Sequence, residues 1–356
     1  MIVFITGTEF PLREDTKMIF NPVSELVVGQ HKEVKPPCPV IDIHTHFGPL
    51  LLGEDYDHDY DIKQISEKLQ KMNIQKAVSL ELVWDEAYDR LQEYLEGSDG
   101  LIIPFGSVDV SQALKPDFEK LVYRTLHSLK AKGSKGIKLW KDMTLNSEKY
   151  FGKMVRLDDE RYKPVWQTCA EEHLPVLIHI GDPPSLFKPI DEHNEHFVCL
   201  NMHPEWSWLK PGMFTFEEHM QMQENILRDN PETIFVIAHV GSYAENLKQV
   251  GEWLDCFPNM FIDVSGRIDQ LGRQPFTAKA FFEKYQDRIL FGTDYEPNLD
   301  VFDFYHTHYR FFQTQDEYFE HPFPDMLGQW RIYGLNLDLP VLEKLYYKNA
   351  QAVFVI

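Results

Sequence analysis

The sequence has few cysteines and little positive charge. Only four of its 356 residues are cysteine, and no two of them form a Cys-x-x-Cys pair. A disulfide framework is therefore not expected, and the wide spacing is typical of ordinary thiols in a reducing compartment. The 35 lysines and arginines are outnumbered by 56 aspartates and glutamates, so the net charge is −21. Most of such a surface repels nucleic acid and anionic membranes, and we expect neither as a partner.

Long hydrophobic runs are absent as well. No stretch approaches the ~20 apolar residues that a membrane span needs. The N-terminal run Met1–Ile5 has no basic leader, and charged residues from Glu9 onward interrupt it before it reaches the length of a secretory signal. The apolar fraction of 43% and the charged fraction of 26% are those of an ordinary globular protein. Together these features predict a cytoplasmic location.

Short apolar segments alternate with amphipathic stretches along most of the chain. The expected strands lie at 40–44, 76–80, 101–108, 136–140, 175–180, 234–239, 260–264 and 288–292. Several are nearly continuous in Val, Ile, Leu and Phe, which is typical of parallel strands covered on both faces. A doubly wound sheet would carry a glycine-rich fingerprint after its first strand, but His44-Thr-His-Phe-Gly48 follows instead. Eight β-then-α units in a row predict an α/β fold, the (β/α)8 TIM barrel.

The intervening stretches carry helix signals. Apolar residues at steps of three and four predict helices at 62–72 and 118–129. Thr215 with Glu218, and Ser242 with Glu245, match the capping-box pattern of a helix start. Pro340 suits the first turn of the last helix.

The chain divides into a short arm and one large domain. Lys35-Pro36-Pro37 breaks both helix and sheet, so we expect an N-terminal arm over residues 1–36 and a barrel domain over 37–356. Two connections are too long for simple turns, at 182–214 after the fifth strand and at 295–339 after the eighth. Both follow the carboxyl ends of strands, which form the active-site face of a barrel.

Side chains that can bind a metal follow four of the expected strands. In the first strand, alternation predicts that Asp42, His44 and His46 share one face. The fifth, sixth and eighth strands end in His179, His239 and Asp294. One such histidine is more often a core residue, but four histidines and an aspartate at strand ends of one barrel predict a common metal site.

These segments, with Gly136-Ile-Lys138 and Tyr347-Lys-Asn-Ala350, resemble the amidohydrolase superfamily. The similarity is closest to its amidohydrolase-2 branch, which includes aminocarboxymuconate-semialdehyde decarboxylase, and it covers nearly all of the chain from about residue 38. The resemblance implies one divalent metal ion, commonly zinc, with manganese(II) or iron(II) as alternatives. The implied metal ligands are His44, His46, His179 and Asp294.

Two residues are the expected catalytic groups. By the resemblance, His239 lies beside the metal-bound water or the substrate. Asp294 can ligate the metal and also accept a proton from water, since a bound divalent ion lowers the pKa of water to ~7. His239 can polarise a substrate oxygen or donate a proton to the leaving group.

Lys138 and Trp140 are substrate-binding candidates. They alternate on one face of the fourth strand, so Lys138 is expected to point into the barrel. Some members of the superfamily bridge two metals with a carboxylated lysine at this strand, but we expect a single metal with Lys138 nearby. An ion pair of Lys138 with Asp42 or another buried carboxylate is an equally good interpretation.

Two arginines of the loop after the seventh strand, Arg267 and Arg273, complete the substrate-binding candidates. A guanidinium group binds a planar carboxylate through two hydrogen bonds. The same arginines would also suit a surface or subunit-interface salt bridge.

The first functional hypothesis is a metal-dependent hydrolase that cuts a C–N or C–O bond in a small amide, lactone or ester. The second is a lyase with the same metal site, a non-oxidative decarboxylase or hydratase of an unsaturated or aromatic acid. A non-catalytic metal-binding barrel and a phosphoesterase of the polymerase-and-histidinol-phosphatase type are weaker alternatives. No Gly-x-Ser-x-Gly elbow supports a serine nucleophile. We expect a small-molecule substrate as partner, with a carboxylate as one candidate, and a homodimer as the oligomeric state.

Overall fold

A computed structural model of the chain describes residues 24–328 and 330–356. Eight parallel strands run in chain order: β1 (Val40–Thr45), β2 (Ile74–Leu80), β3 (Ile102–Phe105), β4 (Ile137–Leu139), β5 (Val176–Ile178), β6 (Phe235–Ile237), β7 (Met260–Asp263) and β8 (Ile289–Leu290). The pairing order is β1-β2-β3 and β4 to β8. Single parallel bridges, Gly106 with Ile137 and Thr45 with Tyr295, join the two groups. The strands therefore close into the predicted (β/α)8 barrel.

The interior of the barrel is filled by side chains that alternate along the strands. Ile41 and Ile43 of β1 belong to a buried inner cluster with Val78, Leu80, Phe105, Leu177, Val236, Ala238 and Leu290. The C-terminal helix α17 (Asn349–Phe354) adds Ala350 and Phe354 to the same cluster. The intervening strand residues, such as Val40 and Ile178, pack outward against the helices. This alternation leaves the carboxyl ends of the strands to carry polar groups.

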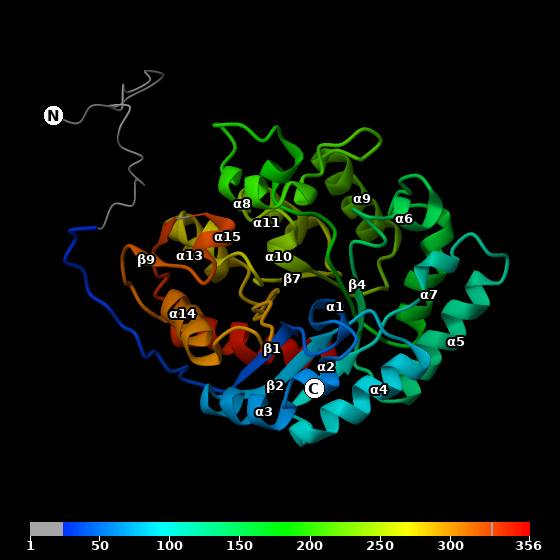
Figure 1. Ribbon diagram of the computed structural model, residues 1–356, viewed down its shortest axis with the longest axis horizontal. Helices are drawn as coiled ribbons and strands as arrows, with labels where there is room; N and C mark the ends of the chain where they lie inside the picture. Colours follow the sequence, from blue (N-terminus) through cyan, green and yellow to red (C-terminus); the bar gives the residue numbers. More distant parts are fainter. Residues whose placement is uncertain (1–23, 329) are drawn as a thin grey trace.

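Helices surround the strands (Figure 1). The longer ones are α3 (Ile62–Lys71), α4 (Asp85–Leu95), α5 (Phe118–Ala131), α7 (Lys163–Glu171), α9 (Phe216–Asp229), α11 (Leu247–Cys256), α13 (Pro275–Lys284) and α14 (Val301–Gln313). The shorter ones are α1 (Pro49–Leu52), α2 (Tyr56–Asp59), α6 (Glu148–Phe151), α8 (Phe197–Met202), α10 (Ala238–Gly241), α12 (Ile268–Gly272), α15 (Pro324–Leu327) and α16 (Leu339–Glu343). Helices α3 and α5 lie where the apolar spacing predicts them. None of the described helices combines the length and apolar composition of a membrane span.

One of the two predicted capping boxes is present. The Thr215 hydroxyl accepts from the Glu218 amide, and the Glu218 carboxylate accepts from the Thr215 amide, so this pair starts α9. The prediction for Ser242 was wrong. Ser242 has a φ of 63° and ends α10, and the side chain of Asn246 caps α11 by accepting from the Gln249 amide. The left-handed conformation of Ser242 closes α10, as is common at helix ends, and no sequence pattern marked that conformation.

Both long connections carry structure of their own. Residues 182–214 contain α8 and two short 3₁₀ turns, Pro184–Phe187 and Pro204–Trp206. Residues 295–339 contain α14, the short antiparallel pair β9 (Phe319–Glu320) and β10 (Arg331–Ile332), and α15. Helix α14 packs against the barrel through aromatic residues, and it is the outer helix of the last unit.

The described part of the expected arm, residues 24–36, forms no helix or strand. It lies along α14, where the Arg310 guanidinium donates to Gln30 Oε1 and the His306 ring nitrogen lies 2.8 Å from the Val34 carbonyl oxygen. Residues 1–23 lie outside the described residues, and the arm boundary at residue 36 stays a prediction.

Candidate active site

Most of the sequence-predicted site residues converge on one cavity of about 370 Å³ at the carboxyl end of the barrel. The predicted residues that line it are His44, His46, Lys138, Trp140, His179, His239, Arg267 and Asp294. They come from β1, β4 and the segments that follow β1, β4, β5, β6, β7 and β8. The carboxyl ends of parallel strands meet at one face of a barrel, so residues at these strand ends lie close together although they are far apart in the sequence.

Asp42 is the exception on β1. It lies between the inward-facing Ile41 and Ile43, and it accepts hydrogen bonds from the Tyr305 and Thr293 hydroxyls at 2.7 and 2.6 Å. The expectation that Asp42 shares a face with His44 and His46 is therefore wrong. The register of β1 shifts between Asp42 and Thr45, and this irregularity turns His44 toward the cavity.

Asp294 joins the two histidines that follow β1. Its Oδ1 lies 3.3 Å from His44 Nε2 and 3.2 Å from His46 Nε2. Burial opposes the ionisation of Asp294, but the neighbouring imidazoles hold the pKa of this carboxyl well below its usual range. Burial likewise opposes the protonation of His46, yet the carboxylates of Asp294 and Glu81 raise the pKa of this ring to about 9. The site thus favours a positive charge between these groups.

His179 and His239 present facing nitrogens. His179 Nε2 lies 2.8 Å from Asp182 Oδ1, and His239 Nδ1 lies 2.9 Å from the Ser265 carbonyl oxygen. Both partners can only accept a hydrogen bond. The Ser265 partner is a carbonyl oxygen, and Asp182 is ionised, because Lys141 and His179 hold its pKa well below the usual range although burial opposes this. These two ring nitrogens therefore carry the protons.

The remaining nitrogens, His179 Nδ1 and His239 Nε2, are 2.9 Å apart. Burial lowers the pKa of His179 to about 4 and that of His239 well below its usual range, so both rings are neutral. Each facing nitrogen then holds a lone pair, and two lone pairs cannot form a hydrogen bond. A shared cation would stabilise this arrangement.

His44 is oriented in the same way. Its Nδ1 lies 2.8 Å from Asp263 Oδ2, and burial lowers the pKa of the ring. The other Asp263 oxygen accepts from the His239 amide at 2.9 Å and from the Ser265 hydroxyl at 2.6 Å. Asp263 therefore fixes two of the histidines, with the His44 Nε2 lone pair directed at Asp294. Metal-binding histidines commonly donate their second nitrogen to a carboxylate or carbonyl in this manner.

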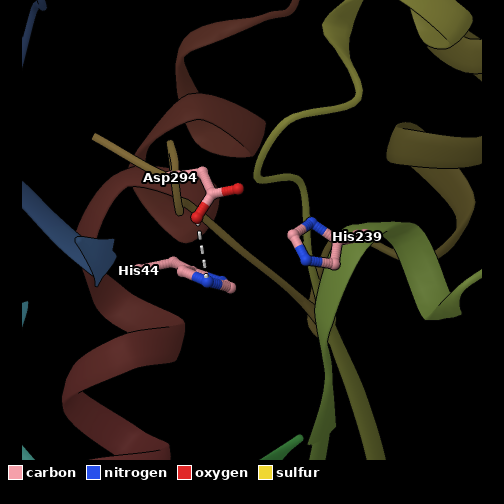
Figure 2. Close-up of side chains that lie close together, drawn as sticks. All are labelled: His44, His239 and Asp294. Atoms are coloured by element: carbon pink, nitrogen blue, oxygen red, sulfur yellow. Dashed lines mark ion pairs between the residues drawn. The ribbon is translucent and has the colours of Figure 1, made fainter. Parts of the chain in front are cut away.

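The donor set fits a divalent metal ion. One ligand atom each from His44, His239 and Asp294 lies within 4.8 Å of the other two (Figure 2). Imidazole nitrogens with a carboxylate are the donors that zinc, manganese and iron take in proteins. The close group contains His239, whereas the resemblance implied His46 and His179. His46 contacts Asp294 of this group, and His179 contacts His239. The set of four ligands implied by the resemblance stays a prediction.

Lys138 points into the barrel. It is 1% exposed, and its Nζ lies 3.3 Å from His44 Nε2. Burial lowers the pKa of Lys138 to about 8, although Asp294 and Asp263 oppose this. The ion pair with Asp42 is not formed, because Asp42 accepts from the Thr293 and Tyr305 hydroxyls instead.

The two arginine candidates differ in position. Arg267 lines the cavity and is 8% exposed, and its Nη1 donates to the Gly266 carbonyl oxygen at 2.6 Å. Arg273 is not among the lining residues. Its Nη1 lies 2.8 Å from Glu195 Oε2, and its guanidinium lies 4.7 Å from the Trp330 ring centroid. Its salt bridge and ring contact match the alternative interpretation rather than substrate binding.

Sequence reasoning missed two buried carboxylates beside the site. Asp182 joins His179 to the Trp208 indole and to Lys141, at 2.7 and 3.0 Å. Glu81 accepts from the backbone amides of the loop after His46, namely Phe47, Gly48 and Leu50. The signal for Glu81 was present, because it directly follows the apolar end of β2. Asp182 lies four residues after the end of β5, in a loop, where strand alternation no longer predicts which side chains face the site.

Comparisons with known proteins identify the fold and the family of this chain. A family model described as amidohydrolase matches residues 41–356. No curated protein matches the chain in sequence. Among solved structures, 4-oxalomesaconate hydratase from Rhodopseudomonas palustris aligns at 14% identity with a TM-score of 0.53, covering 89% of this chain and 95% of that one.

Two decarboxylases show the same fold. The 2,6-dihydroxybenzoate decarboxylase from Rhizobium aligns at 14% identity and a TM-score of 0.53, covering 89% of this chain and 98% of its own. The 5-carboxyvanillate decarboxylase from Novosphingobium aromaticivorans, solved with manganese and a nitrobenzoic acid, aligns at 13% identity and a TM-score of 0.52, covering 92% and 100%. At such identities the likeness supports the fold alone. The family model, however, spans most of the chain and confirms the resemblance seen in the motifs, so the chain belongs to the amidohydrolase family of metal-dependent enzymes.

Proposed function

We propose that this chain is a metal-dependent hydrolase that cleaves a C–N or C–O bond of a small amide, lactone or ester. The observation that carries the proposal concerns Asp294. Its Oδ1 faces His44 and His46, while its Oδ2 has no hydrogen bond from the described residues, and the side chain is 32% exposed. An ionised carboxylate with a free oxygen at the cavity is a proton acceptor for water there.

The proposed metal ligands are His44, His46, His179 and Asp294, with His239 beside them, and zinc is the proposed ion ahead of manganese(II) or iron(II). When bound, a divalent ion supplies a Lewis acid that lowers the pKa of a coordinated water to ~7. Asp263 and Asp182 keep His44 and His179 in the tautomers whose lone pairs face inward. These hydrogen bonds fix the donor atoms before any ligand arrives.

In the proposed reaction, water attacks the substrate carbonyl carbon and gives a proton to Asp294 Oδ2. The C–N or C–O bond then breaks, and Asp294 returns the proton to the leaving nitrogen or oxygen. His239 Nδ1 is committed to the Ser265 carbonyl, so only its Nε2 faces the reacting groups. With a lone pair there, His239 accepts a hydrogen bond or a metal, and it donates a proton only after taking one up.

The second candidate is a lyase, a non-oxidative decarboxylase or hydratase of an unsaturated or aromatic carboxylic acid. Arg267 favours it, because a buried guanidinium that lines the same cavity suits a substrate carboxylate. Lys138 adds a second positive charge near the cluster, and Trp140 supplies an apolar wall. Both candidates use the same ligand set.

A substrate screen with the zinc-loaded protein separates the two candidates. Lactones, amides, esters and carboxylic acids are incubated while acid release and CO2 are monitored. The hydrolase predicts acid release without CO2, and D294N should lower turnover by ~100-fold or more, whereas D287N, with its exposed carboxylate, serves as the matched control. Production of CO2, or hydration of a double bond, would favour the lyase. Undiminished turnover in D294N would exclude the proposed proton path.

A further inference from the structure

A further polar side chain, His196, reaches the cavity from the 182–214 connection. It lines the cavity and is 1% exposed. Its Nδ1 lies 2.6 Å from the hydroxyl of Ser185, but its Nε2 is buried and has no hydrogen-bond partner among the described residues. A buried polar atom without a partner is uncommon in folded proteins, and at a cavity wall it indicates a contact for a ligand.

The orientation of His196 is fixed by its own loop. Its backbone amide donates to Asn194 Oδ1 at 2.9 Å, and the Asn194 amide group donates to the Ser185 and Pro189 carbonyls at 2.8 and 2.9 Å. Asn194 and Ser185 are themselves buried. The network holds the ring against a segment eleven residues earlier in the chain, so the free nitrogen has a defined position.

Arg267 gives this wall of the cavity a positive charge. Among the described residues its hydrogen bond is to the Gly266 carbonyl, and no carboxylate pairs with it within salt-bridge distance. Among the adjoining acids, Glu195 is bound by Arg273 and Asp182 by Lys141. Glu245 and Asp269 also lie within reach of the Arg267 charge, but burial raises the pKa of each to about 6, and neither forms a salt bridge with Arg267. A buried guanidinium without a paired carboxylate favours an anionic ligand.

We propose that His196 Nε2 and the Arg267 guanidinium form a subsite for a substrate carboxylate that does not react. Ser185 is the positioning residue: its hydroxyl donates to His196 Nδ1, so that the ring carries its proton on Nε2 and donates it to the carboxylate. This inference rests on the proposed function and narrows its substrate class. A hydrolase substrate would be a lactone, amide or ester with a separate carboxylate, and a lyase substrate would be a dicarboxylate.

Titration calorimetry with the full chain tests the subsite. The probes are isophthalate with zinc-loaded protein and benzoate with metal-free protein. Wild type is expected to bind isophthalate more tightly than benzoate, and H196F, which keeps an aromatic ring but removes both ring nitrogens, should weaken the binding of both probes by about 10- to 100-fold. H193Q, a change at an exposed histidine of the same connection, should bind as wild type does.

The Ser185 contact has a separate readout. S185A keeps the ring and should weaken benzoate binding by a smaller factor than H196F does. Histidine ring nitrogen NMR should show benzoate selecting the Nε2–H tautomer of His196 in wild type and to a smaller extent in S185A. If the tautomer of His196 in S185A were the same as in wild type, the positioning role of Ser185 would be overturned. This test does not depend on H196F, so it holds even if H196F fails to fold.

The outcomes separate this inference from the proposed function. Wild-type affinity of H196F for both probes, or failure of wild type to bind either, would overturn the subsite whatever the metal content. Loss of benzoate binding in H196F from a protein that takes up no zinc would support the subsite and contradict the metal-dependent reaction.

Discussion

At the residue scale, several residues of the candidate metal site and its surroundings hold the backbone in a rare conformation. His239 has a φ of 59°, Val240 of 58° and Asp294 of 67°, all in the left-handed region. Valine is strongly disfavoured there because its side chain branches at Cβ. Such positions cost about 1–3 kcal/mol each, and they persist where the surrounding structure enforces them. Here the Asp263 carboxylate binds the His239 amide, and the His44 carbonyl binds the Asp294 amide. The ligand positions are therefore held by the hydrogen-bond network.

Asp182 should control metal affinity without touching the metal. In D182N the amide replaces the carboxylate that accepts from His179 Nε2, so the ring loses its fixed tautomer. We expect zinc affinity to fall by about 10- to 100-fold. A competition titration against a chelator measures this, with E192Q, an exposed change in the same connection, as the control. Equal zinc affinity in D182N and wild type would contradict the role given to Asp182.

His308 should make stability fall in mild acid. It lies in α14 beside Phe291 and Phe304 and is 1% exposed, and burial lowers its pKa from the ordinary value of 6.5 to about 4. The folded state thus disfavours the protonated ring. The stabilisation from the neutral ring is complete above pH ~6.5 and is lost as the pH falls toward ~4.

The H308F variant isolates this effect. Between pH ~7.5 and pH ~5, wild type should lose about 2 kcal/mol of unfolding free energy that H308F retains. Urea unfolding at the two pH values measures the difference. Parallel losses in both proteins would show that His308 does not contribute.

At the scale of elements, the Trp208 indole ties the end of the 182–214 connection to its first residue, Asp182, beside the candidate site. Trp208 Nε1 donates to Asp182 Oδ2 at 2.7 Å, and Trp208 packs in a small cluster with Leu145, Leu186 and Leu200. W208F keeps most of the packing and removes the hydrogen bond, which is worth about 1.5–3 kcal/mol to a charged acceptor. Amides of α8 should exchange with solvent faster by hydrogen-exchange mass spectrometry.

W253F is the matched control for this prediction. Trp253 Nε1 donates to Glu224 Oε1 at the same distance of 2.7 Å, but this bond joins α11 to α9 and does not involve the 182–214 connection. Exchange in α8 should be unchanged in W253F. Equal exchange of α8 in wild type and W208F would mean that the indole does not anchor the connection.

The strands and loops also show how much of the fold and of the candidate site can be predicted from the sequence. The apolar runs located all eight strands, because parallel strands are buried on both faces, and the strand ends located His44, His179, His239 and Asp294. The side-chain period of two failed at Asp42, since a shift in register between strands leaves no mark on the pattern. Arg273 was misplaced for a related reason. Arg273 directly follows the short helix α12, and the sequence does not indicate which residues in and around such a helix face the cavity.

For the whole molecule, the net charge is −21, but a ligand in the cavity responds to the charges that line the cavity. Lys138, Lys141 and Arg267 line the cavity together with Asp182, Asp294 and Glu296, so its walls carry charges of both signs. A divalent ion held there would make the local field favourable to a small carboxylate inside an acidic protein.

Metal binding should stabilise the whole barrel, because the donor atoms come from β1 and from segments after β5, β6 and β8. A ligand present at a hundredfold excess over its Kd stabilises the folded state by about 2.7 kcal/mol, so adding zinc to the chelator-treated protein should raise Tm by about 4 °C. The H44N variant should lose this shift. A zinc-induced shift of equal size in H44N would place the binding elsewhere.

The most direct test of the metal-centred account is the ratio of metal to protein after reconstitution with zinc, manganese(II) or iron(II) and removal of free ions. Inductively coupled plasma mass spectrometry is predicted to give a ratio of about one ion per chain for wild type and well below one for D294A. A ratio near zero for wild type with every metal would contradict the account.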